Sequence, residues 1–227
     1  MKKLLSLIFG VLALSVVPVL LFSSELSTCP ESGPKNNCLG TWESDGNKYV
    51  GEYQNDSWSG KGILTYDGIL HYEGEFKDDL FNGLGTLKLE NGETHVGEFK
   101  DNMKNGPGIT NFSDGSVYEG EYQRNRKHGL GTMTWADGVT YSGHWKEDNF
   151  EGQGTYTFTD GWQYSGDWRY FETYGNSIPH GEGKVNYGEG KKTYSGSWSY
   201  GQYDGAGTEI YPDGSKYVGN WKNGLKC

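Results

Sequence analysis

Aromatic residues, glycine and polar residues alternate along most of the chain, beginning near residue 40. In the segment Tyr118-Glu119-Gly120-Glu121-Tyr122, two rings and a glycine occupy every second position, and carboxylates occupy the positions between them. Successive side chains of a β-strand point to opposite faces, so a period of two is typical of strands. The pattern predicts strands with rings and glycine on one face and polar side chains on the other.

This pattern recurs with a period of 23 residues. Each full unit contains an anchor position, a glycine two residues later, a ring after two more residues and then a Gly-x-Gly pair. The anchors are Tyr49, Tyr72, His95, Tyr118, Tyr141, Tyr164, Tyr194 and Tyr217. The step from Tyr164 to Tyr194 is 30 residues long, chiefly because of an insertion between Trp168 and Gly181.

An acidic residue or asparagine followed by glycine closes each unit, as in Asp114-Gly115. Such a pair between two strands indicates a β-hairpin, because the tight turn needs positive φ. Residues 40–227 are therefore predicted to be all-β, as an elongated, twisted, single-layer antiparallel meander of β-hairpin repeats. Glycine facing glycine across the strands would leave room for neighbouring rings to lie over bare backbone.

The combination of Tyr-x-Gly-x-ring, Gly-x-Gly and Asp-Gly resembles the MORN repeat family. The resemblance covers about residues 38 to 224, with seven full units and partial units at both ends; it departs from the family pattern at His95 and at Glu189. It implies a long, twisted, single-layer sheet of hairpins. It also implies roles in protein scaffolding, dimerisation or membrane attachment, and it implies no catalytic residues.

The first 24 residues differ from the repeats. Lys2 and Lys3 precede an uncharged run over residues 4–22, which as a helix would extend about 28 Å, close to the thickness of a bilayer core. Residues 1–24 are predicted to form a hydrophobic helix that is either a signal peptide or an uncleaved membrane anchor; a lipoprotein signal and a buried core helix are lesser alternatives. Both main alternatives export the remainder, which predicts a periplasmic, secreted or extracytoplasmic membrane-face location.

Residues 25–39 are predicted to form a linker that contains a disulfide. Cys29 and Cys38 flank a segment with proline and glycine, and a short-loop disulfide is expected in an oxidising compartment. Two free thiols are the alternative. Cys227 is left over at the C-terminus, either free or available for an intermolecular bridge.

The formal net charge is −10, from 30 acidic and 20 basic residues, which argues against nucleic-acid binding. The Gly-x-Gly pairs lack the third glycine and the following helix of nucleotide loops. The five histidines have no metal-ligand spacing, and the turn aspartates are too far apart to share a calcium ion. No catalytic residue, metal or cofactor is therefore predicted, and the protein is not expected to be an enzyme.

Two features are candidate binding sites. The insertion carries Tyr170, Phe171 and Tyr174, which could form a recognition loop, although a neutral insertion is the simpler interpretation. An acidic stripe could bind a basic partner, although a solvated face is the simpler interpretation. The stripe consists of Glu52, Glu73, Glu75, Glu98, Glu119 and Glu121.

The sequence thus predicts a non-enzymatic repeat scaffold that mediates protein–protein or membrane-associated interactions outside the cytoplasm. The expected partner is a protein, with self-association as one form, and membrane contact would involve only the N-terminal segment. The alternative is carbohydrate or cell-wall binding through the aromatic side chains of the hairpins.

Overall fold

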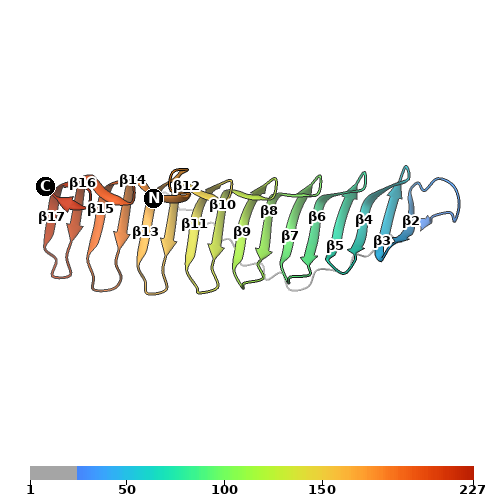
Figure 1. Cartoon of the computed structure of the whole chain (residues 1–227), viewed down its shortest axis with the longest axis horizontal. Coiled ribbons are helices and arrows are strands. Elements are labelled where there is room, and N and C mark those ends of the chain that lie inside the picture. Colours follow the sequence, from blue (N-terminus) through green and yellow to red (C-terminus); the bar gives the residue numbers. More distant parts are fainter. Residues whose placement is uncertain (1–24) are drawn as a thin grey trace, which may run out of the picture.

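The computed structural model describes residues 25–227, which form one elongated sheet of 18 strands (Figure 1). None of these residues is helical. The predicted N-terminal hydrophobic helix lies outside the described residues. Within 25–227 there is accordingly no helix with the length and apolar character needed to cross a bilayer.

The strands follow one another along the chain in a regular order. They are β1 (Ser27–Thr28), β2 (Cys38–Ser44), β3 (Asn47–Gln54), β4 (Ser57–Tyr66), β5 (Leu70–Lys77), β6 (Leu80–Leu89), β7 (Thr94–Lys100), β8 (Met103–Asn111), β9 (Val117–Gln123), β10 (Arg126–Thr134), β11 (Thr140–Lys146), β12 (Asn149–Thr157), β13 (Gln163–Phe171), β14 (Asn176–Asn186), β15 (Thr193–Ser199), β16 (Gln202–Ile210), β17 (Lys216–Lys222) and β18 (Leu225–Lys226).

Each strand pairs with the next strand in sequence, and from β2 onwards every pairing is antiparallel. The short strand β1 is the exception, because it pairs with β2 in parallel. The predicted single-layer antiparallel meander is confirmed. Figure 1 shows the hairpins side by side along one axis, so that each hairpin contacts only its neighbours.

A glycine from each strand between β2 and β17 lies opposite a glycine of the next strand, and together these residues form what we call the glycine spine. The predicted glycine-to-glycine register is thereby confirmed. Its members are Gly40, Gly51, Gly62, Gly74, Gly85, Gly97, Gly108, Gly120, Gly131, Gly143, Gly154, Gly166, Gly183, Gly196, Gly207 and Gly219.

The anchor tyrosines explain why the spine must be glycine. The Tyr72 ring lies across Gly74 and Gly85, and a Cβ atom at either glycine would collide with it. The Tyr72 hydroxyl donates a hydrogen bond to the Glu75 carbonyl oxygen, 3.0 Å away. The same bond to the residue three positions later is made by Tyr49, Tyr118, Tyr141, Tyr164, Tyr194 and Tyr217.

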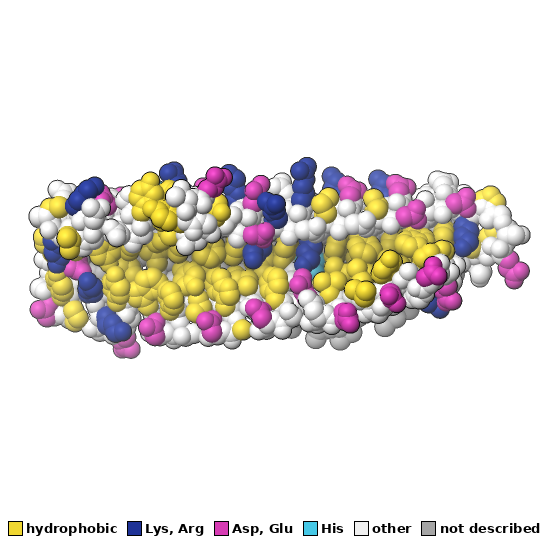
Figure 2. Space-filling view, viewed as in Figure 1, with side chains coloured by type: hydrophobic (Ala, Val, Ile, Leu, Met, Phe, Trp, Pro, Cys, Tyr) yellow, Lys and Arg dark blue, Asp and Glu magenta, His cyan; other side chains and the backbone are white. Residues whose placement is uncertain are grey.

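Rings from adjacent units pack on the anchors and form the core. The Phe81 ring stacks on Tyr72 with 3.7 Å between centroids, while Phe76 and Phe99 meet Tyr72 edge to face. These are favourable arrangements for aromatic pairs. The rings occupy one face of the sheet, here called the ring face. Figure 2 shows it as a recessed hydrophobic band between two polar rims, with basic side chains within the band near its middle. We call this recess the trough.

The short turn of each hairpin is hydrogen-bonded to the preceding hairpin. The Asp79 N–H donates to the Trp58 carbonyl oxygen at 3.1 Å, and the Trp58 N–H donates to Asp79 Oδ1 at 2.6 Å. We call this reciprocal pair of bonds the turn latch. It recurs for Lys35 with Asp56, Phe81 with Asn102, Lys104 with Asn125 and Lys127 with Asp148.

The N-terminal end of the core is covered by the predicted linker. Cys29 and Cys38 form a disulfide, as expected, and Cys38 is buried within the first aromatic cluster. The Lys35 ammonium lies over the Tyr53 ring, 4.5 Å from its centroid. This segment therefore serves as a cap on the first hairpin. Cys227 is an exposed free thiol, and its use in an intermolecular bridge remains a prediction.

Candidate functional site

The face opposite the ring face is here called the reverse face. It carries the side chains of the residues that directly precede and follow each spine glycine. All six glutamates of the predicted acidic stripe lie on it, in two rows. Glu73 and Glu119 lie on one side of the spine. The other row contains Glu52, Glu75, Glu98 and Glu121.

The second row of glutamates lies against backbone of unusual conformation. The Glu75 side chain contacts Gly83, the first glycine of a Gly-x-Gly pair, where φ is +82°. A Cβ at this position would be strained and would also meet the carboxylate. The two glycines of each pair thus have different roles: the first forms an irregularity in the ladder, and the second belongs to the spine.

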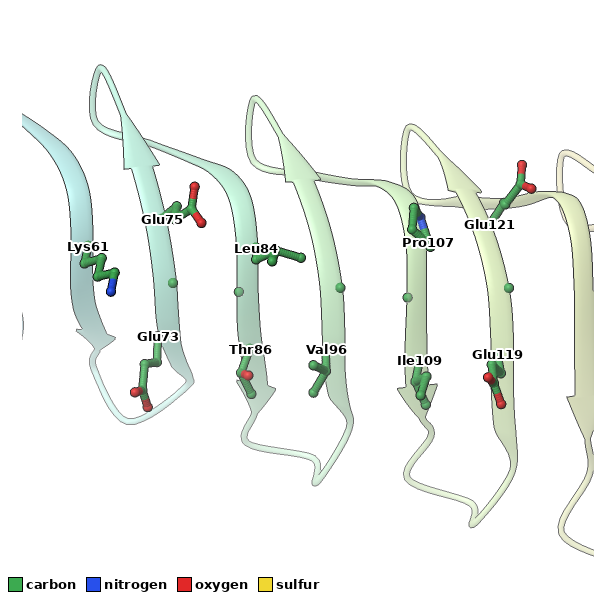
Figure 3. A pocket seen from close by; sticks show the side chains of 15 residues that line it. Lys61, Glu73, Glu75, Leu84, Thr86, Val96, Pro107, Ile109, Glu119 and Glu121 are labelled. Atoms are coloured by element: carbon green, nitrogen blue, oxygen red, sulfur yellow. The ribbon is translucent and has the colours of Figure 1, made fainter. Parts of the chain in front are cut away.

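A groove of about 600 Å³ opens on the reverse face between β4 and β9 (Figure 3). The bare backbone of the glycine spine forms its floor. Apolar side chains line its centre on both sides of the spine, namely Leu84, Val96, Pro107 and Ile109. Leu84 is 61% exposed, which is unusual for a leucine in a strand and makes it available for contact.

Acidic residues flank this apolar centre at both ends. Glu98, opposite Leu84, belongs to the same row, but its carboxylate lies against Gly106 and does not line the groove. Figure 3 shows Glu73 and Glu75 on β5 and Glu119 and Glu121 on β9, with the apolar side chains between them. Lys61 also lines the groove beside Glu75, its cross-strand neighbour. The arrangement is suited to an occupant that is apolar in the middle and basic at its ends.

The insertion does not form an irregular loop. It lengthens one hairpin, because Tyr170 and Phe171 extend β13 and pair with the start of β14. Tyr174 lies in the turn and is 59% exposed. The Phe171 ring packs against Tyr200 of the next hairpin, 4.8 Å between centroids, and against His180 at 5.2 Å. Phe171 and Tyr174 thus belong to a small aromatic cluster with His180 and Tyr200, well away from the groove, whereas Tyr170 has no ring contact with this cluster.

His95 replaces tyrosine at one anchor and is 1% exposed. Its Nδ1 atom is 2.8 Å from the Thr110 hydroxyl, which is 2.5 Å from the Tyr122 hydroxyl. Burial, with a contribution from the nearby Lys104, lowers the pKa of His95 to about 3, so the ring is neutral at physiological pH. Among residues 25–227, no group of three or more potential ligands is arranged to hold a metal ion.

Sequence analysis missed the apolar centre of the groove. Other units carry varied side chains at the positions of Leu84, Val96, Pro107 and Ile109. Some of these are polar, such as Gln153 and Ser142, and others are apolar, such as Leu130 and Val50. A unit-by-unit comparison of these positions does not single the four residues out, because Ile63, Val50 and Leu130 are also apolar. Their proximity across the three strands β6, β7 and β8 depends on the register of the sheet.

The family model for the MORN repeat matches residues 49–68, 72–94, 95–117, 118–140, 141–163, 194–216 and 217–227. These segments make up more than half of the sequence. The chain belongs to the MORN repeat family. The unmatched unit, from residue 164 to 193, is the one that carries the insertion. No curated protein matches the chain.

Several solved structures are similar to this chain. The TCP10 domain of CPAP from Danio rerio, in complex with a peptide of Danio rerio STIL, has 14% sequence identity and a TM-score of 0.45, covering 80% of this chain and 76% of that chain. The SAS-4 (dCPAP) TCP domain of Drosophila melanogaster, in complex with a proline-rich motif of Ana2, has 9% identity and a TM-score of 0.45, covering 86% and 100%. Similarity at this level does not identify a ligand for this chain.

Proposed function

We propose that this protein is a non-enzymatic scaffold that binds an extended segment of a partner protein in the reverse-face groove. The observation that carries the proposal is the apolar centre of the groove between two pairs of glutamates. Apolar contact would supply affinity, and the flanking carboxylates would select basic residues and speed association. The partner segment is thus apolar in its middle and basic at both ends.

The geometry sets the length of that segment. From β5 to β9 the groove crosses four strand spacings, about 19 Å, which an extended peptide covers in roughly six residues. The backbone groups of these strands are already paired within the sheet. Recognition therefore relies on side chains that reach the groove rather than on an added strand.

The proposed setting is outside the cytoplasm, with any membrane contact made through the N-terminal segment. Two observations support it: the uncharged run over residues 4–22 and the disulfide between Cys29 and Cys38. Disulfides persist in oxidising compartments and are rare in the cytosol. Fractionation of the native host, with the protein recovered in the cytosol, would contradict this part of the proposal.

Carbohydrate binding through the repeat rings receives less support. The anchor rings from Tyr49 to Tyr194, His95 included, are buried and cannot stack on a sugar. Exposed rings such as Tyr174 and Tyr200 belong to the lengthened hairpin and its neighbour. Within the described part of the chain, the other exposed rings are Trp42, Tyr66 and Phe158, and none of the exposed rings lines the groove.

The test uses a labelled eight-residue peptide with two arginines at each end and leucine, valine, proline and leucine between them. A matched peptide replaces the arginines with glutamates. We expect the basic peptide to bind at least about tenfold more tightly in a fluorescence anisotropy titration, as steering and complementary charge favour it. Equal binding of both peptides, or of neither, would contradict the proposal.

Variants locate the binding site. Leu84→Ser together with Pro107→Ser should weaken binding of the basic peptide about tenfold, because both exposed side chains line the groove. Leu130→Ser is the matched control. Leu130 is 56% exposed and occupies the position of Leu84 two units further along, beyond the groove. Loss of binding in the control variant alone would place the site elsewhere.

A further inference from the structure

One position in each unit decides whether the trough is filled by a ring or by a charge. It lies nine residues after the anchor in regular units. In four units it holds a ring stacked on the anchor, with centroid distances of 4.4, 3.7, 3.7 and 3.6 Å; these rings are Trp58, Phe81, Phe150 and Tyr203. In two adjacent units in the middle of the array it holds Lys104 and Lys127 instead.

The Lys127 ammonium lies among aromatic rings. It is 5.0 Å from the Trp145 centroid and 5.7 Å from the centroids of Tyr118 and Phe112. The side chain is half-buried, and this burial lowers the pKa of Lys127. Cation–π contacts compensate in part for the lost hydration of the ammonium.

No ion pair among residues 25–227 involves Lys127. Asp148 attracts the ammonium only from beyond ion-pair distance, and its Oδ1 atom already accepts the Lys127 backbone N–H. Lys104 does have a partner, since its Nζ atom is 2.9 Å from Glu93. The pair of lysines therefore carries one ammonium without a bound carboxylate.

Elsewhere on the ring face, a buried charge is matched directly. Glu209 is 2% exposed, and its carboxylate contacts the ammonium groups of Lys192 at 2.6 Å and Lys226 at 2.7 Å. A charge in an apolar setting is costly unless it is paired and hydrogen-bonded. Lys127 differs from this arrangement, because its counter-charge must come from solvent or from a ligand.

Clusters of packed aromatic side chains lie on both sides of the lysines. The aromatic cluster that ends at Phe99 lies towards the N-terminus, and the cluster that begins at Tyr118 lies towards the C-terminus. In Figure 2 basic side chains interrupt the recessed hydrophobic band near the middle of the sheet. A ligand in the trough would therefore meet rings, then ammonium groups, then rings again.

We propose that Lys127, with Lys104 beside it, binds the carboxylate of an acidic residue in an otherwise apolar, extended peptide segment lying in the trough. The site is on the opposite face from the reverse-face groove and selects the opposite charge. It would allow the scaffold to hold two different segments, or two parts of one partner, at the same time.

The repeat spacing defines the complementary peptide. Consecutive hairpins are about 9.6 Å apart, and an extended peptide rises about 3.3 Å per residue, so three residues span one repeat. An acidic residue at Lys127 would place one apolar residue, three positions away, at the Phe150 ring of the next unit. The apolar residue three positions away on the other side would lie at the preceding unit, where the Lys104 ammonium is 5.7 Å from the Tyr122 centroid. The probe is a capped heptapeptide with aspartate at the centre, phenylalanine at both ends and serine elsewhere.

Binding of this heptapeptide is compared by isothermal titration calorimetry with that of two matched peptides, in which lysine or asparagine replaces the aspartate. We expect the aspartate peptide to bind about tenfold more tightly than either, as measured for close charge pairs at interfaces. A peptide preference for lysine, no difference among the three peptides, or no binding would overturn the proposal.

The variant Lys127→Phe installs the ring that Phe150 provides in the next unit, so the fold should be retained, as a thermal melt will verify. It should reduce the preference for aspartate to about one. Lys127→Gln is the second variant, and Lys146→Gln, at an exposed position next to a turn, is the charge-matched control. An unchanged aspartate preference in both Lys127 variants would overturn the proposal.

A final arm addresses anionic lipid. The wild-type protein and Lys127→Gln are sedimented with vesicles of phosphatidylcholine and phosphatidylserine. We expect no Lys127-dependent sedimentation, since the protein as a whole carries a net charge of −10. Lys127-dependent vesicle binding without an aspartate preference would overturn the assignment to a peptide. The arginine peptide of the reverse-face groove should bind all of these variants equally, so the two proposals can fail separately.

Discussion

At the scale of single residues, the anchor side chain determines which neighbouring substitutions are tolerated. An anchor tyrosine fills the space above two spine glycines and satisfies its hydroxyl on a backbone carbonyl three residues later, as Tyr118 does with Glu121. The ring and the glycines therefore form one packing unit. A substitution of the tyrosine or of a spine glycine should therefore disturb the packing of the other residue.

Gly120→Ala tests this coupling. A Cβ at Gly120 would lie 2.5 Å from both the Gly131 Cα and the Tyr118 hydroxyl, and the opposing backbone cannot move away freely. We expect the free energy of unfolding, measured with urea, to fall by about 2–3 kcal/mol, typical of overpacking. Glu119→Ala, at the exposed neighbouring position, should cost less than about 0.5 kcal/mol. Similar values for the two variants would contradict the packing unit.

His95→Tyr should stabilise the protein. The Nε2 atom of His95 is buried without a hydrogen-bond partner, whereas a tyrosine hydroxyl would reach the Glu98 carbonyl in the manner of the other anchors. Leaving a buried polar group unpaired costs about 1–3 kcal/mol. We expect a gain of about 1 kcal/mol in the free energy of unfolding. The reverse change, Tyr118→His, should lose at least as much, and a stabilised Tyr118→His would contradict this reasoning.

At the scale of structural elements, the turn latch joins one hairpin to the next. The Asp79 side chain accepts the Trp58 N–H, and its own backbone adopts a positive φ of 65°. Asn102 and Asn125 fill the corresponding positions in later units with an amide oxygen. Both residue types tolerate this conformation better than alanine does.

Asp79→Ala should therefore lower the free energy of unfolding by about 1–2 kcal/mol, because it removes the acceptor and strains the turn. Asp79→Asn retains the acceptor and is the control, with little expected change. Hydrogen exchange should show faster exchange of the Trp58 amide in the alanine variant. Equal protection of that amide in the alanine and asparagine variants would contradict a role for the latch.

Strand periodicity accounts for most of the structural elements that the sequence predicts. The strands, the anchors and the glycine register follow from the alternation around residues such as Tyr118 and Gly120, because a period of two fixes which side chains share a face. The disulfide followed from the spacing and setting of Cys29 and Cys38. The turn latch could not be predicted, because its bond depends on how adjacent hairpins dock.

The candidate sites were predicted less completely. The six glutamates share a face as expected, because that again depends on strand periodicity. The groove between them required the register of five strands, which brings Leu84 and Ile109 together. The insertion was expected to be a loop, yet Phe171 extends a strand because its ring can pack on Tyr200. That contact joins two hairpins, so the sequence around Phe171 does not reveal it.

At the scale of the whole molecule, charge networks should make stability depend on pH. Glu209 is buried, which raises its pKa, but hydrogen bonds from Lys192, Lys226 and Tyr211 outweigh burial and lower the pKa to about 2. A carboxyl with a lowered pKa stabilises the fold above its unfolded value near 4.5. That stabilisation is lost as the pH falls through the range from about 4.5 to 2.

The difference in free energy of unfolding between the wild type and Glu209→Gln should therefore be constant above about pH 5. This difference should shrink by up to about 3 kcal/mol as the pH falls from 4.5 to 2, because each unit of pKa difference corresponds to about 1.36 kcal/mol. Urea titrations at several pH values would measure it. A difference that stays constant down to pH 2 would contradict the proposed role of the network.

The elongated shape separates the two proposed sites, because a single-layer sheet exposes both of its faces. The reverse-face groove and the trough carry opposite charge preferences on opposite sides of the same strands. A scaffold of this kind would hold its partners without enclosing them. The defining property of the proposed scaffold is the location of the groove, which we propose to bind the basic, apolar-centred segment.

An NMR titration of ¹⁵N-labelled protein with the arginine-flanked peptide tests that location most directly. The amide signals that shift most should come from β5 to β9, centred on Leu84, Val96 and Ile109. Pro107 has no amide proton, so its neighbours report on that position. The amide of Trp145, whose ring lies on the ring face, should change little. Shifts concentrated on the lengthened hairpin at Phe171, or spread evenly along the array, would contradict a peptide-binding groove on the reverse face.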